Sequence, residues 1–307
     1  MSQRVFMASD RPAAAASGTL RSGPFDLGFR IEGAGASALV IGSSVQHPRL
    51  FPTRLRDHLR LAFVDQRAFA RPTREVTPAD FAFDDMLADV ERLREHLQLG
   101  QVVLIGASGN GLIALEYAKR YPNAVTHVVL IATPPGFGAI HVELAERHWA
   151  EAVCPERRAR HDVSMQALEA AVAADPDRAF VTYCLHMGAR TWFDASYDAA
   201  ALWSGVHVNM AGFQHVWGEV FRDLDVAEGL ERLQMPVLIA LGRVDYLIAP
   251  NEAWEPHRAH FPDLTIRVFD RSGHAPPLEE PAAFVTTLLD WLARPRADAE
   301  EATATRR

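Results

Sequence analysis

Short apolar runs recur along the chain at regular intervals, and each predicts a buried β-strand. The runs cover 38–41, 61–65, 102–105, 125–131, 237–241 and 265–269. An alternating segment over 25–31 predicts an antiparallel strand before them. The segments 83–97, 112–121 and 284–292 place apolar residues on one face of a helix. Strands that alternate with helices predict an α/β fold, with a mostly parallel central sheet and helices on both of its faces.

One long stretch, 134–233, interrupts this rhythm. It has no convincing buried strand and is typical of helices rich in aromatic residues. Because ligands bind beyond the carboxyl ends of the strands in an open α/β sheet, helices inserted there would cover the site as a cap. The expected domains are therefore an α/β core over 19–133 and 234–293 and a helical cap over 134–233. The candidate pocket residues are Ser44, Trp192, Phe213 and Trp217.

The two ends of the chain are expected to lie outside the folded core. Residues 1–18 lack the continuous apolar segment of a signal peptide and are expected to form a disordered lead-in. Residues 294–307 have almost no large apolar side chain and predict a disordered tail. No run approaches the roughly 20 apolar residues that span a bilayer. A cytoplasmic location without membrane contact is therefore expected.

Composition narrows the range of partners. The chain has 307 residues, of which 49% are hydrophobic, and this is enough for one large core. Its net charge of −8 offers no basic surface for nucleic acid, and its two cysteines, Cys154 and Cys184, are too few for a disulfide framework. A small-molecule substrate is the expected partner, without a metal or other cofactor, and an oligomer is neither indicated nor excluded. The histidines without metal-ligand spacing are His47, His207, His215 and His260.

The chemistry is expected in the segment 101–121. A buried strand leads into Gly106-Ala-Ser-Gly-Asn-Gly111, and a helix follows. Glycines let the backbone turn sharply, and a serine at such a turn projects its hydroxyl at a helix N-terminus, where backbone N–H groups face a developing oxyanion. Glycine-rich turns also bind phosphate, but no Walker lysine follows this one. The pattern favours Ser108 as a nucleophile, although Asn110 replaces the last glycine of Gly-x-Ser-x-Gly.

Asp245 and His274 follow the last two predicted strands. A serine hydroxyl needs a base, histidine titrates in the right range, and a carboxylate on the other ring nitrogen fixes the tautomer. Ser108, Asp245 and His274 are therefore the candidate catalytic residues, each at the carboxyl end of a strand. Asp270 and Asp223 are reserve candidates for the carboxylate and rank below Asp245.

These motifs resemble those of the α/β-hydrolase superfamily, closest to its proline-iminopeptidase-like branch. The matching stretches are 105–111, Leu241-Gly-Arg-Val-Asp245 and Arg271-Ser-Gly-His274 with Leu278-Glu-Glu-Pro281. The resemblance implies an α/β-hydrolase fold with an inserted cap. It also implies that Ser108 is the nucleophile, that His274 is the general base and then acid, and that Asp245 orients the histidine.

The same resemblance implies an oxyanion hole. Its donors would be the backbone N–H groups of Ser43 and Gly109, with the Ser43 or Ser44 hydroxyl as a further candidate. Two residues depart from the family pattern. Ile41 stands where the family usually has histidine, and Asn110 stands in the serine turn.

Such a triad transfers an acyl group to serine and then to water, so the substrate is expected to be an ester, lactone, thioester or amide. The preferred hypothesis is a serine esterase that cleaves a small, largely apolar carboxylic ester through an acyl-enzyme on Ser108. The alternative is a proline-iminopeptidase-like aminopeptidase, which needs cap carboxylates around an α-ammonium. The available carboxylates are Glu143, Glu146, Asp194, Asp198, Glu219 and Asp223. A catalytically weak ligand-binding member of the fold is the second alternative.

Overall fold

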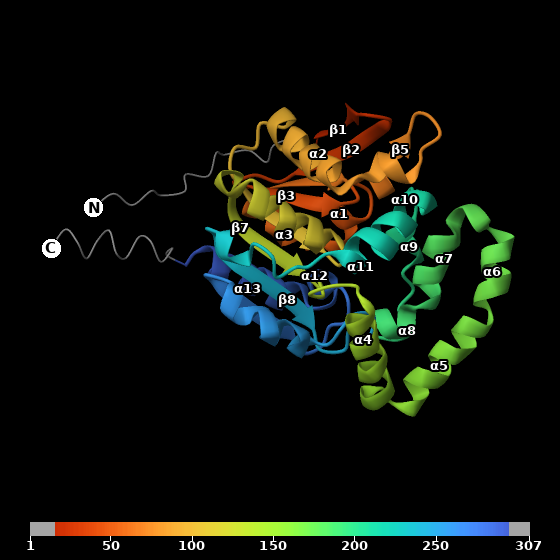
Figure 1. The fold of residues 1–307 in the computed structure, drawn as a ribbon. Coiled ribbons are helices and arrows are strands. Elements are labelled where there is room, and N and C mark those ends of the chain that lie inside the picture. The colour runs from red at the N-terminus through yellow and green to blue at the C-terminus, as the bar shows by residue number, and fades with distance from the viewer. Residues whose placement is uncertain (1–15, 295–307) are drawn as a thin grey trace.

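The computed structural model describes residues 16–294 and arranges them around one mixed β-sheet (Figure 1). The strand order is β1-β2-β4-β3-β6-β7-β8-β9, and the short β5 pairs with β2. Every strand predicted from the apolar runs is present. The strands are β1 (Ala16–Ser22), β2 (Phe25–Glu32), β3 (Ala36–Gly42), β4 (Leu59–Asp65), β5 (Arg71–Pro72), β6 (Val102–Ala107), β7 (Val125–Ile131), β8 (Val237–Gly242) and β9 (Leu264–Phe269).

Each neighbouring pair in the series β4-β3-β6-β7-β8-β9 is parallel. The strand β2 pairs antiparallel with both β1 and β4. Parallel pairing brings the carboxyl ends of β3, β6, β7, β8 and β9 to the same edge of the sheet. In an open α/β sheet this is the edge where ligands bind.

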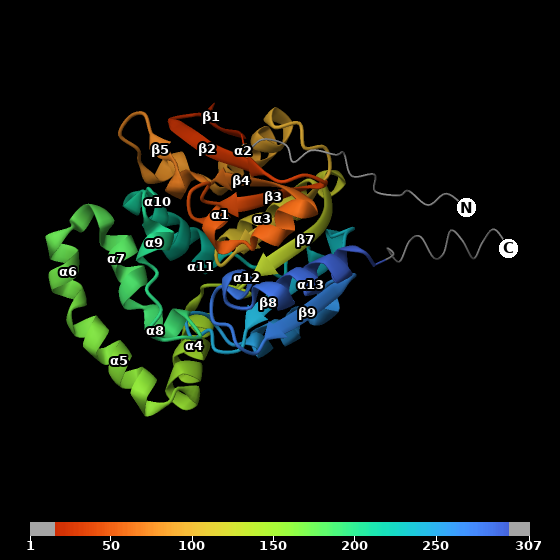
Figure 2. The same cartoon turned by 180° about the vertical axis from the view of Figure 1, so that it is seen from behind.

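Both faces of the sheet are buried, because successive side chains along a strand point to opposite sides. Leu104 of β6 packs in the same cluster as α2 and α3, which lie in front of the sheet in Figure 1. Its neighbours Val103 and Ile105 pack on the opposite face with α13, which is in front in Figure 2. This arrangement confirms the predicted fold class. The helices of the core are α1 (His47–Leu50), α2 (Phe83–His96), α3 (Asn110–Arg120), α12 (Pro276–Glu279) and α13 (Pro281–Leu292).

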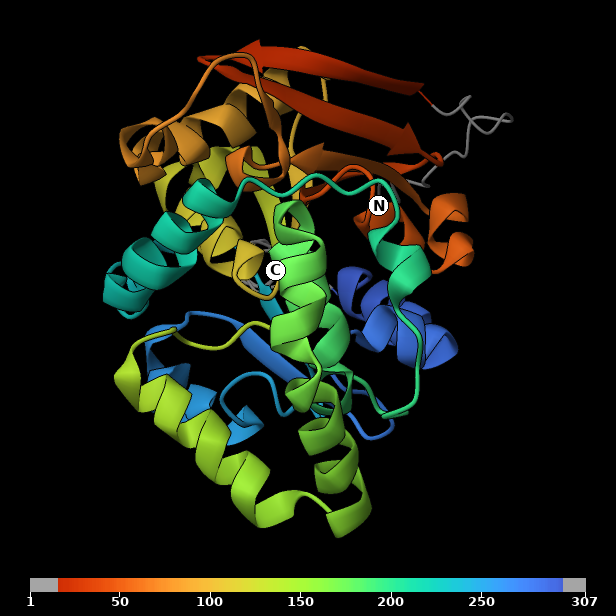
Figure 3. The same cartoon turned by 90° about the vertical axis from the view of Figure 1, so that its right-hand side faces the viewer.

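A helical insertion joins β7 to β8, and it contains no β-strand. Two of its helices, α5 and α6, bury no residue and form an arm that projects away from the sheet (Figure 1). The green helices of the insertion cross the middle of the end of the molecule that is viewed in Figure 3. The helices of the insertion are α4 (Ala139–Ala152), α5 (Pro155–Gln166), α6 (Leu168–Ala174), α7 (Ala179–His186), α8 (Gly188–Thr191), α9 (Ala200–Trp203), α10 (Met210–His215) and α11 (Phe221–Asp223).

The first strand begins inside the expected lead-in. The lead-in is predicted to reach residue 18, but Ala16 already pairs with Ile31, and Gly18 pairs with Phe29. β1 is an edge strand of mostly small or polar residues that exposes most of its side chains, so it has no apolar alternation from which a strand could be predicted. Backbone pairing with β2 holds it in place.

The other predictions about the ends, disorder in residues 1–15 and 295–307, lie outside the described residues. Within 16–294 no helix combines the length and the apolar character that crossing a bilayer requires. The cytoplasmic location stays a prediction.

Candidate active site

Ser108 lies at the turn between β6 and α3, and its backbone is in the left-handed region at φ 54°. This conformation is costly for a residue with a side chain and persists only where the surroundings hold it. Here the Ser108 N–H donates to the carbonyl oxygen of Ile131 at 2.8 Å, which ties the turn to β7. Gly111 packs closely against Thr133. A side chain at this position would place its Cβ 2.0 Å from Thr133 Oγ1, so only glycine fits there. The turn therefore accommodates Asn110 and keeps a glycine at the next, crowded position.

His274 and Asp245 form a hydrogen-bonded pair at the ends of β9 and β8, with Asp245 buried and His274 partly buried. A hydrogen bond of 2.7 Å joins His274 Nδ1 to Asp245 Oδ2, and Asp245 Oδ1 accepts the N–H of Leu247 at 3.0 Å. Burial alone would lower the pKa of His274, but the charge of Asp245, its hydrogen bond and the charge of Glu279 outweigh burial and raise that pKa. A carboxylate on Nδ1 leaves Nε2 as the ring atom that can accept a proton.

The two reserve carboxylates lie away from this histidine. Asp270 pairs with Arg243 at 2.9 Å, and Asp223 pairs with Arg222 at 2.6 Å, all with largely exposed side chains. Within the described residues, Asp245 is therefore the carboxylate that contacts the His274 ring.

A cavity of about 350 Å³ brings Ser108 and His274 together beneath the inserted helices. Within residues 16–294 the His274 ring has Asp245 as its hydrogen-bond partner, and no hydrogen bond joins it to the Ser108 hydroxyl. Proton transfer between them requires the Ser108 hydroxyl to come within hydrogen-bonding distance of the ring. Catalytic hydrogen bonds of this kind often tighten only when substrate is bound.

The wall of the cavity is mostly apolar, rich in aromatic side chains, and includes the three predicted cap residues, Trp192, Phe213 and Trp217. The Phe213 and Trp217 rings stack with their centroids 4.2 Å apart. Trp217 lies in a π-helical turn, Val216–Val220. Its indole nitrogen is so close to Gly109 that a Cβ added at Gly109 would lie 2.6 Å from it. The insertion therefore packs directly on the serine turn.

Ser44, in contrast, is not part of the wall. The chain after β3 turns Ser44 toward β4, where its N–H donates to Asp65 Oδ1 at 2.5 Å.

No Asp, Glu, Lys or Arg lines this cavity. Burial raises the pKa of the Cys184 thiol in the wall to about 12, so this thiol stays protonated at neutral pH. The carboxylates proposed for an ammonium site all lie outside the wall, and Glu146 forms a two-pronged ion pair with Arg190 at 2.5 and 2.7 Å. The polar wall residues besides Ser108 and His274 are Gln46, His47, Asn110, Tyr183, Cys184 and Thr191.

The two predicted oxyanion donors differ in the structure. The N–H of Gly109, at the start of α3, has no acceptor within residues 16–294 and is free beside Ser108. The N–H of Ser43 instead donates to Nδ1 of His47 at 3.0 Å. The Ser43 hydroxyl also stabilises this turn, since it accepts the N–H of Gln46 at 3.2 Å. The structure thus corrects the expectation that the Ser43 N–H is open to a substrate oxygen.

Comparisons with known proteins agree with this geometry. Residues 32–153 match the family model described as the alpha/beta hydrolase fold. The chain is 40% identical over 275 residues to the AB hydrolase superfamily protein YclE of Bacillus subtilis, a match that covers 90% of this chain and 98% of that protein. The chain belongs to the α/β-hydrolase superfamily.

Two further proteins are similar to this α/β-hydrolase. It is 27% identical over 254 residues to a probable proline iminopeptidase of Streptomyces coelicolor, a match that covers 70% of this chain and 74% of that one. The crystal structure of VinJ matches with a TM-score of 0.68 at 19% identity, over 92% of this chain and 99% of VinJ, and so shares the fold. The resemblance to the proline-iminopeptidase-like branch is confirmed.

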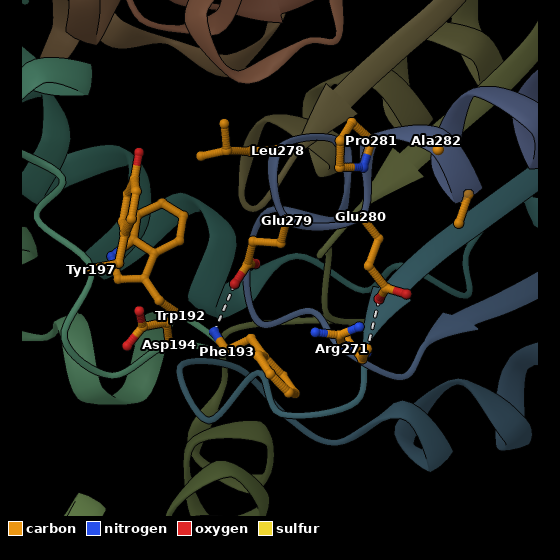
Figure 4. Close-up of a pocket in the computed structure, with 11 residues that line it drawn as sticks. Trp192, Phe193, Asp194, Tyr197, Arg271, Leu278, Glu279, Glu280, Pro281 and Ala282 are labelled. Carbon is orange, nitrogen blue, oxygen red and sulfur yellow. Dashed lines mark hydrogen bonds between the residues drawn. The ribbon is translucent and has the colours of Figure 1, made fainter.

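In this α/β-hydrolase a partly buried carboxylate, Glu279, supports the histidine loop. Glu279 Oε2 accepts the N–H groups of Gly273 and Ala275, on either side of His274, at 2.9 and 3.1 Å. Glu279 Oε1 accepts the N–H of Phe193 from the insertion at 2.6 Å, as the dashed line in Figure 4 shows. One side chain therefore links the base to the insertion.

The insertion is also bound to both loops through its backbone. The His274 N–H donates to the carbonyl oxygen of Thr191 at 2.7 Å, and the N–H of Tyr246, next to Asp245, donates to the carbonyl oxygen of Arg190 at 3.0 Å. The segment 190–193 is thus part of the scaffold that holds the acid and the base. A lid movement that kept this scaffold intact would have to come from other parts of the insertion.

Sequence reasoning missed three residues of this site. Glu279 belongs to a quoted motif, but its role depends on contacts with the insertion that spacing does not reveal. His47 is noted in the sequence only for its lack of metal-ligand spacing, whereas the structure packs it, at 4% exposed, into the cavity wall. Asn110 is noted only as a departure, whereas its Oδ1 is buried without a hydrogen-bond partner at the wall. The only available signal for His47 was its place in the loop that the family uses for oxyanion donors.

Proposed function

We propose that this α/β-hydrolase is a carboxylic-ester hydrolase that acts on small, neutral, largely apolar esters through an acyl-enzyme on Ser108. The observation that carries the proposal is the mostly apolar wall around Ser108 and His274, which contains no Asp, Glu, Lys or Arg. Burying an unpaired charge costs several kcal/mol, so such a wall favours neutral groups on both sides of the scissile bond. The volume of about 350 Å³ suits a small ligand.

In the proposed mechanism Ser108 Oγ attacks the ester carbonyl carbon while His274 Nε2 takes the hydroxyl proton. The resulting oxyanion accepts a hydrogen bond from the Gly109 N–H. When the tetrahedral intermediate collapses, the C–O bond to the alcohol breaks and His274 returns the proton to the leaving oxygen. Water then repeats both steps and releases the acid, while Asp245 stabilises the imidazolium each time.

An aminopeptidase is the second candidate, because a probable proline iminopeptidase is among the relatives. That reaction requires a carboxylate near the substrate's α-ammonium, and the wall supplies none. A purely ligand-binding role is less well supported, since it needs neither a strained serine nor a hydrogen-bonded His–Asp pair.

Turnover of p-nitrophenyl butyrate and of proline β-naphthylamide by the purified protein tests the reaction class. We expect ester cleavage that Ser108→Ala abolishes, with little or no amide cleavage. Faster cleavage of the amide would reverse the assignment, and an ester rate that survives Ser108→Ala would remove the proposed acyl-enzyme.

A matched pair of esters tests the neutral wall. The p-nitrophenyl ester of hexanoic acid and that of ε-aminohexanoic acid have similar chain lengths, but the second carries a terminal ammonium. We expect kcat/KM to favour the neutral ester by at least about tenfold, since an unpaired charge in an apolar site costs more than 1.4 kcal/mol. Equal values would show that the acyl chain does not enter this cavity.

A further inference from the structure

His47 lies next to the loop that is expected to supply an oxyanion donor. It is the first residue of α1, after the loop 43–46 that follows β3, and packs directly on Gly42, where an added Cβ would lie 2.3 Å from the ring carbon Cε1. The ring is almost fully buried and forms part of the cavity wall that also contains Ser108. A polar ring in this position can contact the substrate.

One hydrogen bond determines where the His47 proton sits. The backbone N–H of Ser43 can only donate, so Nδ1, which lies 3.0 Å away, must accept with its lone pair. A ring with an unprotonated Nδ1 is neutral and carries its hydrogen on Nε2. Burial agrees with this assignment, because it lowers the pKa of His47 to about 4.

The Nε2–H group has no protein acceptor within residues 16–294. Nε2 is not among the fully enclosed polar atoms that lack a partner, so this donor opens onto the cavity and can reach a ligand there. Since His47 lines the cavity, a substrate oxygen beside Ser108 is the acceptor for which this donor is placed.

We propose that His47 is a catalytic residue whose Nε2–H replaces the engaged Ser43 N–H as the second oxyanion donor, beside the N–H of Gly109. The inference rests on the proposed ester hydrolysis. When Ser108 Oγ bonds to the carbonyl carbon, the C=O π pair moves to oxygen, and this oxygen accepts hydrogen bonds from both donors. No proton leaves His47, and the serine proton still passes to His274. The Ser43 N–H polarises the ring from behind and fixes its tautomer.

Two variants separate the donor from the packing. His47→Phe keeps a planar ring but has no donor, whereas the amide of His47→Gln can accept from Ser43 with its oxygen and donate to the cavity with its nitrogen. His58→Phe, at an exposed histidine, is the matched control. The measurements are kcat and KM for p-nitrophenyl butyrate and the rate constant for labelling of Ser108 by a fluorophosphonate, whose phosphoryl oxygen occupies the same hole.

We expect His47→Phe to lower kcat/KM and the labelling rate by about a hundredfold, mostly through kcat, which is typical for loss of one oxyanion donor. His47→Gln should recover at least about tenfold of that loss, and His58→Phe should match the wild type. Rates of His47→Phe within about threefold of wild type would overturn the proposal, as would a loss confined to KM. If the wild type is labelled but does not cleave the ester, the proposed function fails while the labelling ratios still decide the role of His47.

The tautomer gives a test that needs no variant to be active. Long-range ¹H–¹⁵N spectra of histidine-labelled wild type at neutral pH should show one neutral ring with its hydrogen on Nε2, and this signal should be absent from His47→Gln. A His47 ring with its hydrogen on Nδ1, or a charged ring, would refute the assignment even if the variants proved too unstable to assay.

Discussion

The cavity around Ser108 has a histidine side and a serine side, and their polar groups are used differently. On the histidine side, both oxygens of Asp245 and both of Glu279 accept hydrogen bonds from the protein. On the serine side, the N–H of Gly109, Nε2 of His47 and Oδ1 of Asn110 have no partner within the described residues. One side is complete before a substrate arrives, and the other is not.

This difference follows from what each side does in the proposed reaction. The histidine side holds a charge that is present throughout, so its dipoles can be satisfied permanently. The serine side faces a charge that exists only in the transition state, so its donors are useful only if the protein leaves them free. Variants on the two sides should therefore affect different observables.

The largest effect is expected on the histidine side, from Asp245→Asn. An amide there favours the wrong tautomer of His274, with the hydrogen on Nε2, and that ring cannot accept the serine proton. We expect kcat to fall by about 10⁴ with little change in KM, measured with p-nitrophenyl butyrate. Asp270→Asn is the matched control, because Asp270 is exposed and paired with Arg243. A loss below about tenfold in Asp245→Asn would mean that this pair does not orient the base.

On the serine side, His47 should make the wild type sensitive to acid. The folded protein keeps the ring neutral down to its pKa of about 4, whereas the unfolded chain binds the proton near pH 6.5. Between these values the unfolded chain binds more protons, so folding is destabilised as pH falls. We expect the unfolding free energy of wild type, relative to that of His47→Gln, to drop by about 3 kcal/mol from pH 6.5 to pH 4. Urea titrations of both proteins measure this, and a constant difference would show that His47 is accessible to protons.

The scaffold of the histidine side can be weakened without touching the triad. In Glu279→Gln the amide can replace only one carboxylate oxygen, so the bond to Phe193 or the bonds beside His274 are lost. We expect kcat/KM to fall about tenfold. In the wild type, kcat/KM falls on the acid side as His274 becomes protonated, above pH 6.5 because the pKa of His274 is raised. The charge of Glu279 contributes to that raised pKa, so in Glu279→Gln the fall should move to lower pH.

The neighbouring residue supplies the control for that experiment. Glu280 accepts from the N–H of Arg271 at 2.8 Å and from the Ser272 hydroxyl at 2.7 Å, without bonding the residues beside His274 (Figure 4). Glu280→Gln should leave the fall of kcat/KM at the same pH as in the wild type. Equal shifts in the two variants would mean that Glu279 acts only as a general negative charge.

The smallest effect is expected from Asn110→Ala on the serine side. Removing a buried acceptor that has no partner, at the start of α3, should raise the unfolding free energy by about 1 kcal/mol. The ester rate should change by less than about tenfold, because the free N–H groups remain. A clear loss of stability would indicate that this amide is satisfied in solution.

The sequence predicts the core of this fold because its strands are buried on both faces and their apolar runs are unbroken. It also locates Ser108, Asp245 and His274, since each directly follows a strand and parallel strands share one carboxyl edge. It does not predict β1, which has no apolar alternation and is held largely by backbone pairing with β2. Nor does it predict the roles of Ser43, His47 and Glu279, because these depend on single hydrogen bonds between a loop and its surroundings.

The central claim is that Ser108 is activated by the His274–Asp245 pair inside the cavity. Incubation with a fluorophosphonate, followed by intact-mass and peptide-mass analysis, tests it most directly. We predict that wild type gains the mass of one probe, located on Ser108, and that Ser108→Ala and His274→Ala gain none in the same time. Equal labelling of His274→Ala, or a probe attached to another residue, would contradict the claim.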